Sequence, residues 1–247
     1  MCPFEPKSLS SADSFQLATT DVHLWGCRLG EAREAYAELE NHLEEGERSR
    51  ADRFRRQQDA ARYIVGRGLL RFMIGKYLDL NPRHLRFEYG QQGKPYLENG
   101  NGLQFNLSHA GDLAMLAFSL DRAVGVDVES REREIRGDEI AFRFFSTAEQ
   151  AELRALEAED RAAAFLRGWT RKEAFIKVRG QSILKELARF SVSLAPGDDA
   201  PIREIEGVDG VPGSWQMRTV ETDGYVATVC WEGQADLSCR QPFGGRL

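Results

Sequence analysis

The sequence predicts an α+β protein built from two similar halves, each a small, mostly antiparallel sheet packed on one long helix. Two amphipathic helical patterns, at residues 59–78 and 162–178, lie far apart in the chain. Each is preceded by an apolar strand-like run and followed by several short ones between turn residues. This repeated order predicts a pseudo-twofold pair of α/β subdomains divided near residue 122, with a candidate active site in the cleft between them.

The first half, residues 1–122, is expected to begin with a strand over Val22–Leu29 and a charge-rich helix over Glu31–Leu43. Its main helix covers Asp59–Leu78, because apolar side chains at positions 61, 65, 69 and 72 recur every three or four residues. Asn81-Pro82 ends this helix, since proline cannot continue it. Three strands then follow between Gly-containing turns: Leu85–Tyr89, Leu103–Leu107 and Leu113–Leu120.

The second half, residues 123–247, repeats this order with a strand over Ala123–Glu129, a polar helix after Ser146 and a long helix over Ala162–Val178. Three strands follow: Phe190–Leu194, Trp215–Val220 and Tyr225–Trp231. The polar segments at residues 8–14 and 233–247 resemble ordinary chain ends, so we expect both ends of the chain to fray.

Composition narrows the functional classes. The 247 residues are 42% hydrophobic, which suits a folded protein, and their net charge of −6 disfavours nucleic acid as a partner. The start lacks an export signal and no apolar run is long enough to span a bilayer, so a cytoplasmic protein with no membrane partner is expected. No Cys-x-x-Cys pair is present, so we expect reduced thiols at the four cysteines, Cys2, Cys27, Cys230 and Cys239.

Two carboxylates are spaced two residues apart in Gly125-Val126-Asp127-Val128-Glu129. On a strand they point to one face and the valines to the other. Close like charges repel, and a divalent cation relieves that repulsion. Hard oxygen ligands favour Mg²⁺, Mn²⁺ or Ca²⁺ over Zn²⁺. The alternative is a half-exposed strand with a solvated acidic face.

A second acidic group lies on the long helix of the second half. Trp169, Glu173 and Lys177 share one face at a spacing of four residues. Glu173 is a candidate third metal ligand, and Lys177 can neutralise a phosphate oxygen or accept a proton. A plain surface ion pair, worth about 0.2–0.5 kcal/mol, is the alternative. Glu149 fits a capping box with Ser146, although a carboxylate near a metal can also hold a water ligand or act as a general base.

Basic groups that can hold an anionic ligand are spread over the first half. They comprise Arg48, Arg50, Arg53, Arg62 and, in a turn bounded by Gly93 and Pro95, Lys94. His109 follows Ser108 at the end of a predicted strand, where it binds a phosphate or merely satisfies a carbonyl. No Gly-x-Ser-x-Gly hydrolase motif, phosphate-binding Gly-x-x-x-x-Gly-Lys loop or dinucleotide fingerprint is present in the sequence.

Taken in order, these motifs resemble the 4′-phosphopantetheinyl transferase superfamily, in its longer, two-half (Sfp-like) class that serves polyketide and nonribosomal-peptide synthases. The strand at residues 125–129 matches its Gly-Ile/Val-Asp-Ile/Val-Glu motif, and the helix at 169–177 matches Trp-x-x-Lys-Glu-Ala/Ser-x-x-Lys. Three further features match in order: Gly93-Lys94-Pro95, Phe105-Asn106-Leu107-Ser108-His109, and Phe144-Phe145-Ser146 followed by Glu149. The resemblance spans roughly residues 47–194.

The resemblance implies an enzyme, a Mg²⁺-dependent holo-[acyl-carrier-protein] synthase. It would move 4′-phosphopantetheine from coenzyme A to a serine of an apo acyl or peptidyl carrier protein, releasing adenosine 3′,5′-bisphosphate. It implies Mg²⁺ ligation, with Mn²⁺ a possible substitute, by Asp127, Glu129 and Glu173, and catalytic roles for Glu149, Glu173 and Lys177. The residues implied to bind coenzyme A are Arg50, Arg62, Gly93, Lys94, Pro95, Ser108, His109 and Lys177. Glu47 stands where relatives often have lysine.

The implied halves have separate tasks. Residues 1–122 would contact the coenzyme A phosphates, and residues 123–247 would hold the metal and the carrier protein. Carrier proteins are generally acidic, so we expect docking near Arg179 and over Ile183–Phe190. A chain with two halves can form its cleft alone, so a monomer is expected.

Two other functions compete with the transferase. A Mg²⁺-dependent nuclease also sets carboxylates beside a lysine, but the Glu173–Lys177 spacing is helical and the chain is acidic. A non-catalytic module that binds coenzyme A or a carrier protein would be expected to lack one of the metal carboxylates, yet all three are present.

Overall fold

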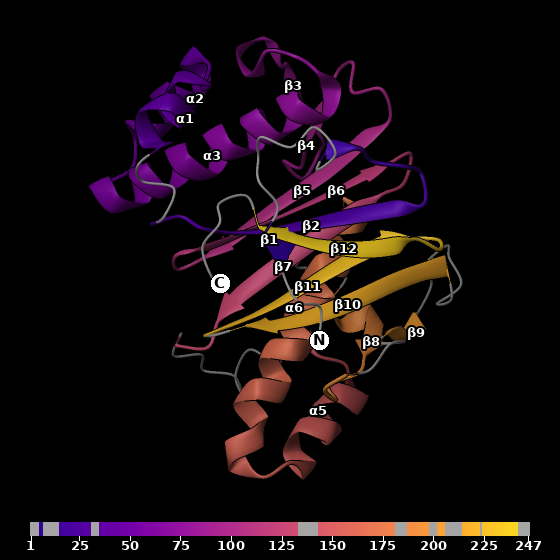
Figure 1. Cartoon of the computed structure of the whole chain (residues 1–247). Helices are drawn as coiled ribbons and strands as arrows, with labels where there is room; N and C mark the ends of the chain where they lie inside the picture. Colours follow the sequence, from indigo (N-terminus) through magenta and orange to yellow (C-terminus); the bar gives the residue numbers. More distant parts are fainter. Residues whose placement is uncertain are drawn as a thin grey trace.

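The computed structural model describes residues 5–6, 15–30, 35–132, 143–180, 187–197, 202–205, 214–222 and 224–241. They form a helix, a sheet, a second sheet and a second helix, stacked as four layers (Figure 1). The two long helices cover the outer faces of the two sheets, and the inner faces of the sheets pack on each other. The α+β class and the two-part architecture are therefore confirmed.

The first half contributes most of a five-stranded sheet of order β1-β12-β2-β6-β5. Its strands are β1 (Glu5–Pro6), β2 (Asp21–Arg28), β5 (Leu103–Ala110), β6 (Leu113–Leu120) and β12 (Asp236–Gln241). The helices are α1 (Tyr36–Asn41), α2 (Glu45–Ala51) and α3 (Gln57–Leu78), followed by a 3-10 turn at Pro82–His84. A hairpin pairs β3 (Phe87–Tyr89) with β4 (Pro95–Leu97). The helix predicted over Glu31–Leu43 is confirmed only for Tyr36–Asn41, and residues 31–34 lie outside the described residues.

The second half contains a three-stranded sheet of order β10-β11-β7 and a small two-stranded one. The strands are β7 (Val124–Ser130), β8 (Phe190–Val192), β9 (Ile202–Ile205), β10 (Trp215–Thr222) and β11 (Tyr225–Glu232). The helices are α5 (Thr147–Ala155), α6 (Ala158–Arg179) and a 3-10 turn at Leu187–Arg189. Each predicted strand of this half is present with shifted ends.

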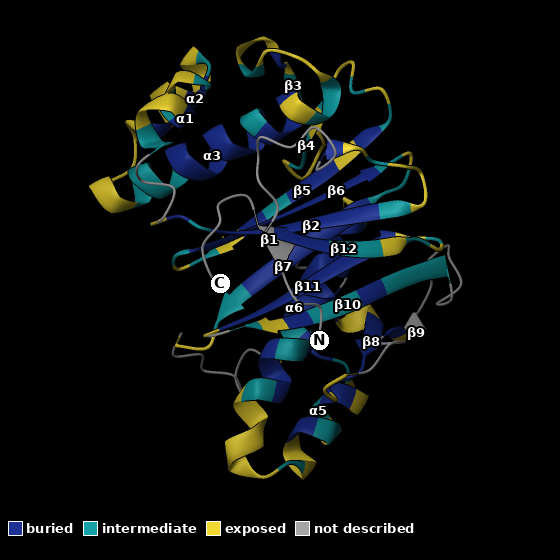
Figure 2. Cartoon of the chain, viewed as in Figure 1, coloured by how far each residue is buried: buried dark blue, intermediate teal, exposed yellow. Residues whose placement is uncertain are grey.

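The burial of side chains explains this layering (Figure 2). Leu69 and Leu70 of α3 pack on one face of the first sheet. Val126 and Val128 of β7 are buried between the two sheets, as the alternation of the 125–129 strand predicts. Phe175 of α6 packs in another hydrophobic cluster, on the outer face of the second sheet. Strand β7 therefore buries its valines inward and turns its carboxylates toward α6.

Two expectations for the chain ends and cysteines were wrong. Part of the tail expected to fray forms β12, which pairs in parallel with β2 and so adds a strand from the second half to the first sheet. Backbone pairing and the burial of Cys239 stabilise this strand although its sequence is polar. Cys27 and Cys230 are free and buried as expected, whereas Cys239 is disulfide-bonded.

Helix α6 approaches β7 most closely at Gly125. A Cβ atom at this position would lie 2.4 Å from the Ala174 carbonyl oxygen and 2.4 Å from the Val178 amide nitrogen. Both atoms belong to the helix backbone and cannot rotate away. The absence of a side chain at Gly125 therefore lets α6 bring Glu173 and Lys177 next to the acidic strand.

We expect Gly125→Ala to lower the free energy of unfolding by about 3 kcal/mol or more, because overpacking here must displace backbone. Urea unfolding measures this directly. Gly46→Ala is the matched control: Gly46 lies inside α2 with no atom within 4 Å of its added Cβ. It should gain roughly 0.5–1 kcal/mol. Equal stability of the two variants would contradict the close contact.

Candidate active site

The site is assembled where β7, β5 and α6 meet. Asp127 and Glu129 lie on β7 and face α6, which supplies Glu173 and Lys177. Ser108 comes from β5, the edge strand of the first sheet. Both halves of the chain therefore contribute to it. Trp169, one turn before Glu173, packs against Phe165, so this helix face is partly buried rather than a solvated stripe.

Asp127 is the most connected residue of the site. Its Oδ1 accepts hydrogen bonds from Lys177 Nζ at 2.7 Å and from Ser108 Oγ at 3.0 Å. Lys177 Nζ also donates to Ser108 Oγ at 3.0 Å. The Asp127 side chain is buried, and its second oxygen, Oδ2, has no hydrogen-bond partner among the described residues. A buried carboxylate oxygen without a partner is costly, so this atom is available to a ligand or a cation.

The neighbouring carboxylates are electrostatically coupled. Burial, together with the negative charges of Asp127 and Glu129, raises the pKa of Glu173 to about 7, while Lys177 acts in the opposite direction. Among the described residues, no three His, Cys, Asp or Glu side chains are yet arranged as a metal site. The unpartnered Asp127 Oδ2 and the crowding of carboxylates nevertheless suit a hard divalent cation chemically.

A pocket of about 400 Å³ opens at the carboxyl ends of β5 and β7. Ser108, His109, Asp127 and Glu129 are among its lining residues. His109 is exposed, so its ring is accessible to a ligand. Four of the predicted site residues therefore share one pocket, and Lys177 is in contact with two of them.

A larger pocket of about 810 Å³ lies on the first half. Arg62 lines it together with the first turn of α3 and Asp112, which is only three residues after His109. Arg62 lies 3.8 Å from Asp59, and a third of its side chain is exposed. The structure thus separates Arg62 from the carboxylates but places it next to the end of β5. Arg50 is exposed on α2 and lies over the Tyr63 ring at 5.4 Å, lining neither pocket.

Lys94 is held differently from the expectation. It stands between Gly93, which has a positive φ of 78°, and Pro95, the first residue of β4. Its Nζ donates to the Val124 carbonyl and to the Lys177 carbonyl, each at 2.9 Å. Burial lowers the pKa of Lys94 to about 8. Both of its partners are backbone atoms of the second half, so the ammonium does not face the pocket of the carboxylates.

Of the two roles considered for Glu149, helix capping and catalysis, the structure shows helix capping. It completes the capping box, accepting from the Ser146 amide at 2.6 Å while Ser146 Oγ accepts from the Glu149 amide. It also accepts from the Val192 amide at 2.8 Å and pairs with Lys172 at 2.9 Å. The residue is only 1% exposed. The geometry therefore disfavours a direct base, because both Glu149 oxygens are buried and engaged.

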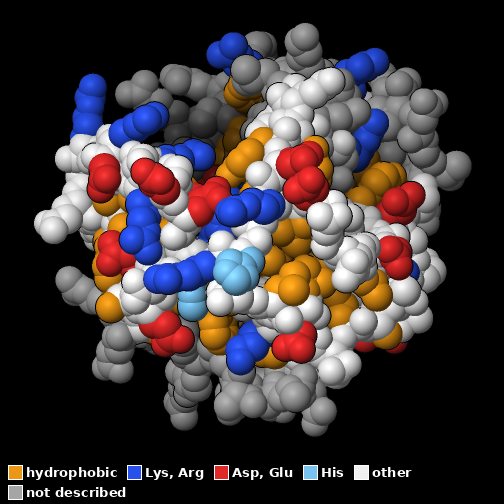
Figure 3. Space-filling view, turned by 90° about the horizontal axis from the view of Figure 1, so that it is seen from above, with side chains coloured by type: hydrophobic (Ala, Val, Ile, Leu, Met, Phe, Trp, Pro, Cys, Tyr) orange, Lys and Arg blue, Asp and Glu red, His pale blue; other side chains and the backbone are white. Residues whose placement is uncertain are grey.

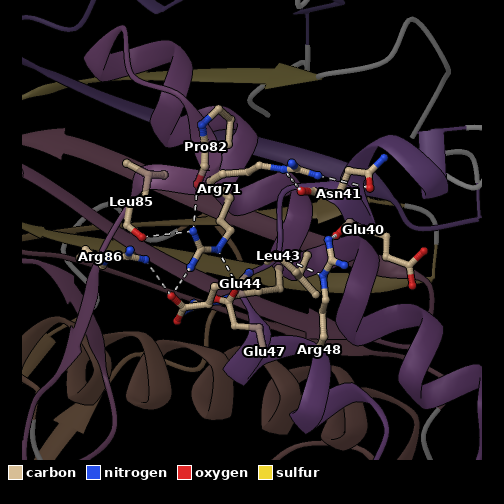
Figure 4. A network of polar contacts seen from close by, with 12 residues as sticks. Glu40, Asn41, Leu43, Glu44, Glu47, Arg48, Arg71, Pro82, Leu85 and Arg86 are labelled. Atoms are coloured by element: carbon tan, nitrogen blue, oxygen red, sulfur yellow. Dashed lines mark hydrogen bonds and ion pairs between the residues drawn. The ribbon is translucent and has the colours of Figure 1, made fainter.

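Glu47, found where the resemblance predicts a lysine, is buried as well. It accepts from Nε of Arg67. It also accepts from Nε of Arg71 at 2.6 Å (Figure 4). Arg71 also donates to the Pro82 carbonyl, so this network joins α2, α3 and the turn that follows. Two arginines compensate the buried charge of Glu47. Glu47 therefore helps to hold α2 against α3.

Sequence reasoning missed two buried polar residues near the site. Lys172 stands in the Trp-x-x-Lys-Glu motif directly before Glu173, and its Nζ donates to two carbonyls as well as to Glu149. Asn106 stands in the motif that contains Ser108, and its Oδ1 accepts from the Val126 amide at 2.8 Å. For Asn106 the available signal was a polar residue between Phe105 and Leu107, whereas Lys172 stands between Arg171 and Glu173 and carries no such signal.

Comparisons with known proteins identify the family of the chain. The model described as "4'-phosphopantetheinyl transferase superfamily" matches residues 123–230, and "4'-phosphopantetheinyl transferase, N-terminal" matches residues 31–121. The chain is 33% identical to 4'-phosphopantetheinyl transferase HetI of Nostoc sp., over 91% of this chain and 93% of that protein. It is 32% identical to 4'-phosphopantetheinyl transferase Sfp of Bacillus subtilis, over 74% and 79% of the two chains.

A solved structure is also similar over part of the chain. It is a holo-(acyl-carrier-protein) synthase from Bacillus anthracis, 21% identical, covering 45% of this chain and 96% of its own with a TM-score of 0.36. The family models together cover most of the chain, and HetI matches it over nearly its whole length. The chain belongs to the 4′-phosphopantetheinyl transferase superfamily.

Proposed function

We propose that this chain transfers 4′-phosphopantetheine from coenzyme A to a serine of an apo acyl or peptidyl carrier protein. The observation that carries the proposal is the contact among Asp127, Lys177 and Ser108, which brings a partly unsatisfied carboxylate and an ammonium together between the halves. The first half would hold the nucleotide end of coenzyme A, and the second half the reacting centre and the carrier.

The phosphates have two neighbouring places to bind. The pocket with Ser108 and His109 adjoins the carboxylates, and the larger pocket with Arg62 lies beyond Asp112. A pyrophosphate in the first pocket and the 3′-phosphate nucleoside in the second would connect the two. The face seen in Figure 3 mixes acidic and basic side chains, which supports a small anionic ligand over a long polyanion. Among the described residues no helix has the length and apolarity needed to cross a membrane.

Asp127, Glu129 and Glu173 are the residues we propose to hold Mg²⁺. When bound there, the cation would offset negative charge that develops on the pyrophosphate. The support comes from this chain: an unpartnered buried oxygen on Asp127, and a Glu173 whose pKa is raised by burial and by its acidic neighbours. Hard carboxylate oxygens suit Mg²⁺ and also Mn²⁺.

In the reaction, the serine hydroxyl oxygen bonds to the β-phosphorus of coenzyme A, and the bond from that phosphorus to the bridging oxygen breaks. Adenosine 3′,5′-bisphosphate leaves with the bridging oxygen, and the serine proton passes to solvent water. The Lys177 side chain is about a quarter exposed, and its Nζ is placed to neutralise a pyrophosphate oxygen. Its hydrogen bonds to Asp127 and Ser108 hold this ammonium in place, and it stays accessible to a ligand.

To test this, the intact mass of an apo carrier protein is measured after incubation with coenzyme A, Mg²⁺ and this protein. A gain equal to one phosphopantetheine supports the transferase. Unchanged carrier mass together with coenzyme A binding would instead support a non-catalytic binding module. A panel of fatty-acid, polyketide and peptide carriers tests the substrate range. Of the expected docking surface, Arg179 and residues 187–190 are described, and Ile183 and Leu184 lie outside the described residues.

Magnesium alone should stabilise the protein. At a concentration 100 times its dissociation constant, a ligand that binds only the folded state adds about 2.7 kcal/mol, which corresponds to roughly 5–10 °C in melting temperature for a chain of this size. Thermal unfolding with and without Mg²⁺, in the absence of coenzyme A, measures the shift. Glu173→Gln should abolish it. An equal shift in that variant would place the cation elsewhere.

A further inference from the structure

The two halves meet along two strands that lie side by side without pairing. Strands β5 and β7 contact each other, but β5 ends the first sheet and β7 ends the second, and no ladder joins them in the described part of the chain. Each therefore presents an unpaired edge of backbone N–H and C=O groups to the other. Buried groups of this kind need partners.

Side chains of the first half supply those partners one after another. Lys94 Nζ donates to the Val124 carbonyl at 2.9 Å, and Asn106 Oδ1 accepts from the Val126 amide at 2.8 Å. Ser108 Oγ then donates to Asp127 at 3.0 Å. These three contacts fall on consecutive parts of β7 and end at the carboxylate of the active site. The first two satisfy backbone groups on the edge of β7, and the third continues the line of contacts to the Asp127 side chain.

Lys94 also connects β7 to α6. Its second hydrogen bond goes to the carbonyl of Lys177, in the last turn of that helix. That carbonyl also accepts from the Gly180 amide at 3.3 Å, and a cation near the C-terminal end of a helix is favoured by the helix dipole. The same residue Lys177 sends its side chain to Asp127. Lys94 therefore fixes the backbone of the residue whose ammonium enters the site.

We propose that Lys94 and Asn106 are positioning residues that set the register of β7 and Lys177 against the first half, and that Lys94 is not a ligand of the coenzyme A phosphates. The proposal rests on the proposed transfer reaction. Each half holds part of the reacting system, and a displacement of about 1 Å between the two parts can lower the rate by about 10²-fold.

A phosphate ligand would behave differently. Neutralising a phosphate mainly contributes binding, so its loss raises KM for coenzyme A. Loss of a positioning residue lowers kcat and destabilises the protein even with no ligand present. Lys94 is half-buried, and its ammonium donates two hydrogen bonds to backbone carbonyls of the second half, which agrees with a role in positioning.

The test compares Lys94→Met, Asn106→Leu and the double variant with Arg62→Met as control. Lys94→Met and Asn106→Leu should each lower kcat by about 10- to 100-fold, with KM for coenzyme A changed by less than about threefold. Each should also lower the ligand-free melting temperature by roughly 3–10 °C, as loss of a buried hydrogen bond does. The double variant should lose less kcat than the product of the two single losses, because both residues hold the same contact between the first half and β7.

Arg62→Met should show the opposite pattern, with KM for coenzyme A raised and the ligand-free melting temperature unchanged. If Lys94→Met followed the Arg62→Met pattern, or if Asn106→Leu kept its kcat, the proposal would be overturned. The melting measurement needs no substrate, so it reports on the contact between the first half and β7 independently of catalysis. Wild-type protein that modifies no carrier would contradict the proposed function instead, which keeps the two failures distinguishable.

Discussion

Replacing Asp127 with asparagine is expected to reduce carrier modification by on the order of 10³-fold, a loss typical of removing one preorganised charge-stabilising group. The new amide side chain would keep an oxygen for Lys177 and Ser108, so the local hydrogen bonds and the fold should survive. The negative charge would be lost, and with it the proposed hold on a divalent cation through Oδ2, the oxygen that has no partner among the described residues. Strand β7 would remain in place, because its valines are buried between the sheets.

The measurement is the initial rate of carrier mass gain at saturating coenzyme A and Mg²⁺, with the melting temperature of each protein alongside. Asp121→Asn is the matched control, since Asp121 is exposed in the turn before β7 and has a positive φ of 55°, which asparagine tolerates. It should transfer at the wild-type rate. Transfer by Asp127→Asn at a rate near that of the control would remove Asp127 from the reaction.

The local features of the site could be predicted from sequence because they depend on residues close together in the chain. Alternation along residues 125–129 fixed which side chains of β7 turn inward, and Val126 and Val128 are indeed buried. A spacing of four residues put Glu173 and Lys177 on one face of α6, where both are coupled to Asp127. The capping box of Ser146 and Glu149 is present as its spacing indicates.

The features that the sequence could not predict depend on contacts between segments that are far apart in the chain. Lys94 in a Gly/Pro turn suggested a phosphate ligand, but its two acceptors are carbonyls 30 and 83 residues away. Strand β12 is polar and short, and it exists because β2 offers it an edge at the far end of the chain. Local pattern carries no information about such partners, since propensity is overridden by tertiary context.

The same limit applies to Glu149, which a motif comparison cannot distinguish from a catalytic base. Glu149 pairs with Lys172, whose side chain leaves α6 about 100° around the helix axis from that of Glu173. Lys172 is fully buried and its other two partners are the Leu187 and Phe190 carbonyls. Burial lowers the pKa of Lys172, and the charge of Glu149 opposes that effect. The pair therefore anchors the segment leading into β8 against both helices.

Glu149→Ala is expected to lower the free energy of unfolding by about 3–5 kcal/mol, because it leaves the Lys172 ammonium buried without a counter-charge. Adding Lys172→Met should recover part of that loss, since the double variant buries no unpaired charge. Urea unfolding of the single and double variants measures both values. Assayed well below its melting temperature, Glu149→Gln should still modify the carrier within about threefold of the wild-type rate, as expected of a residue outside the reacting centre. A Glu149→Gln protein with wild-type stability and a rate reduced 100-fold would instead identify Glu149 as a catalytic group, and would require α5 to move toward Asp127 when the substrates bind.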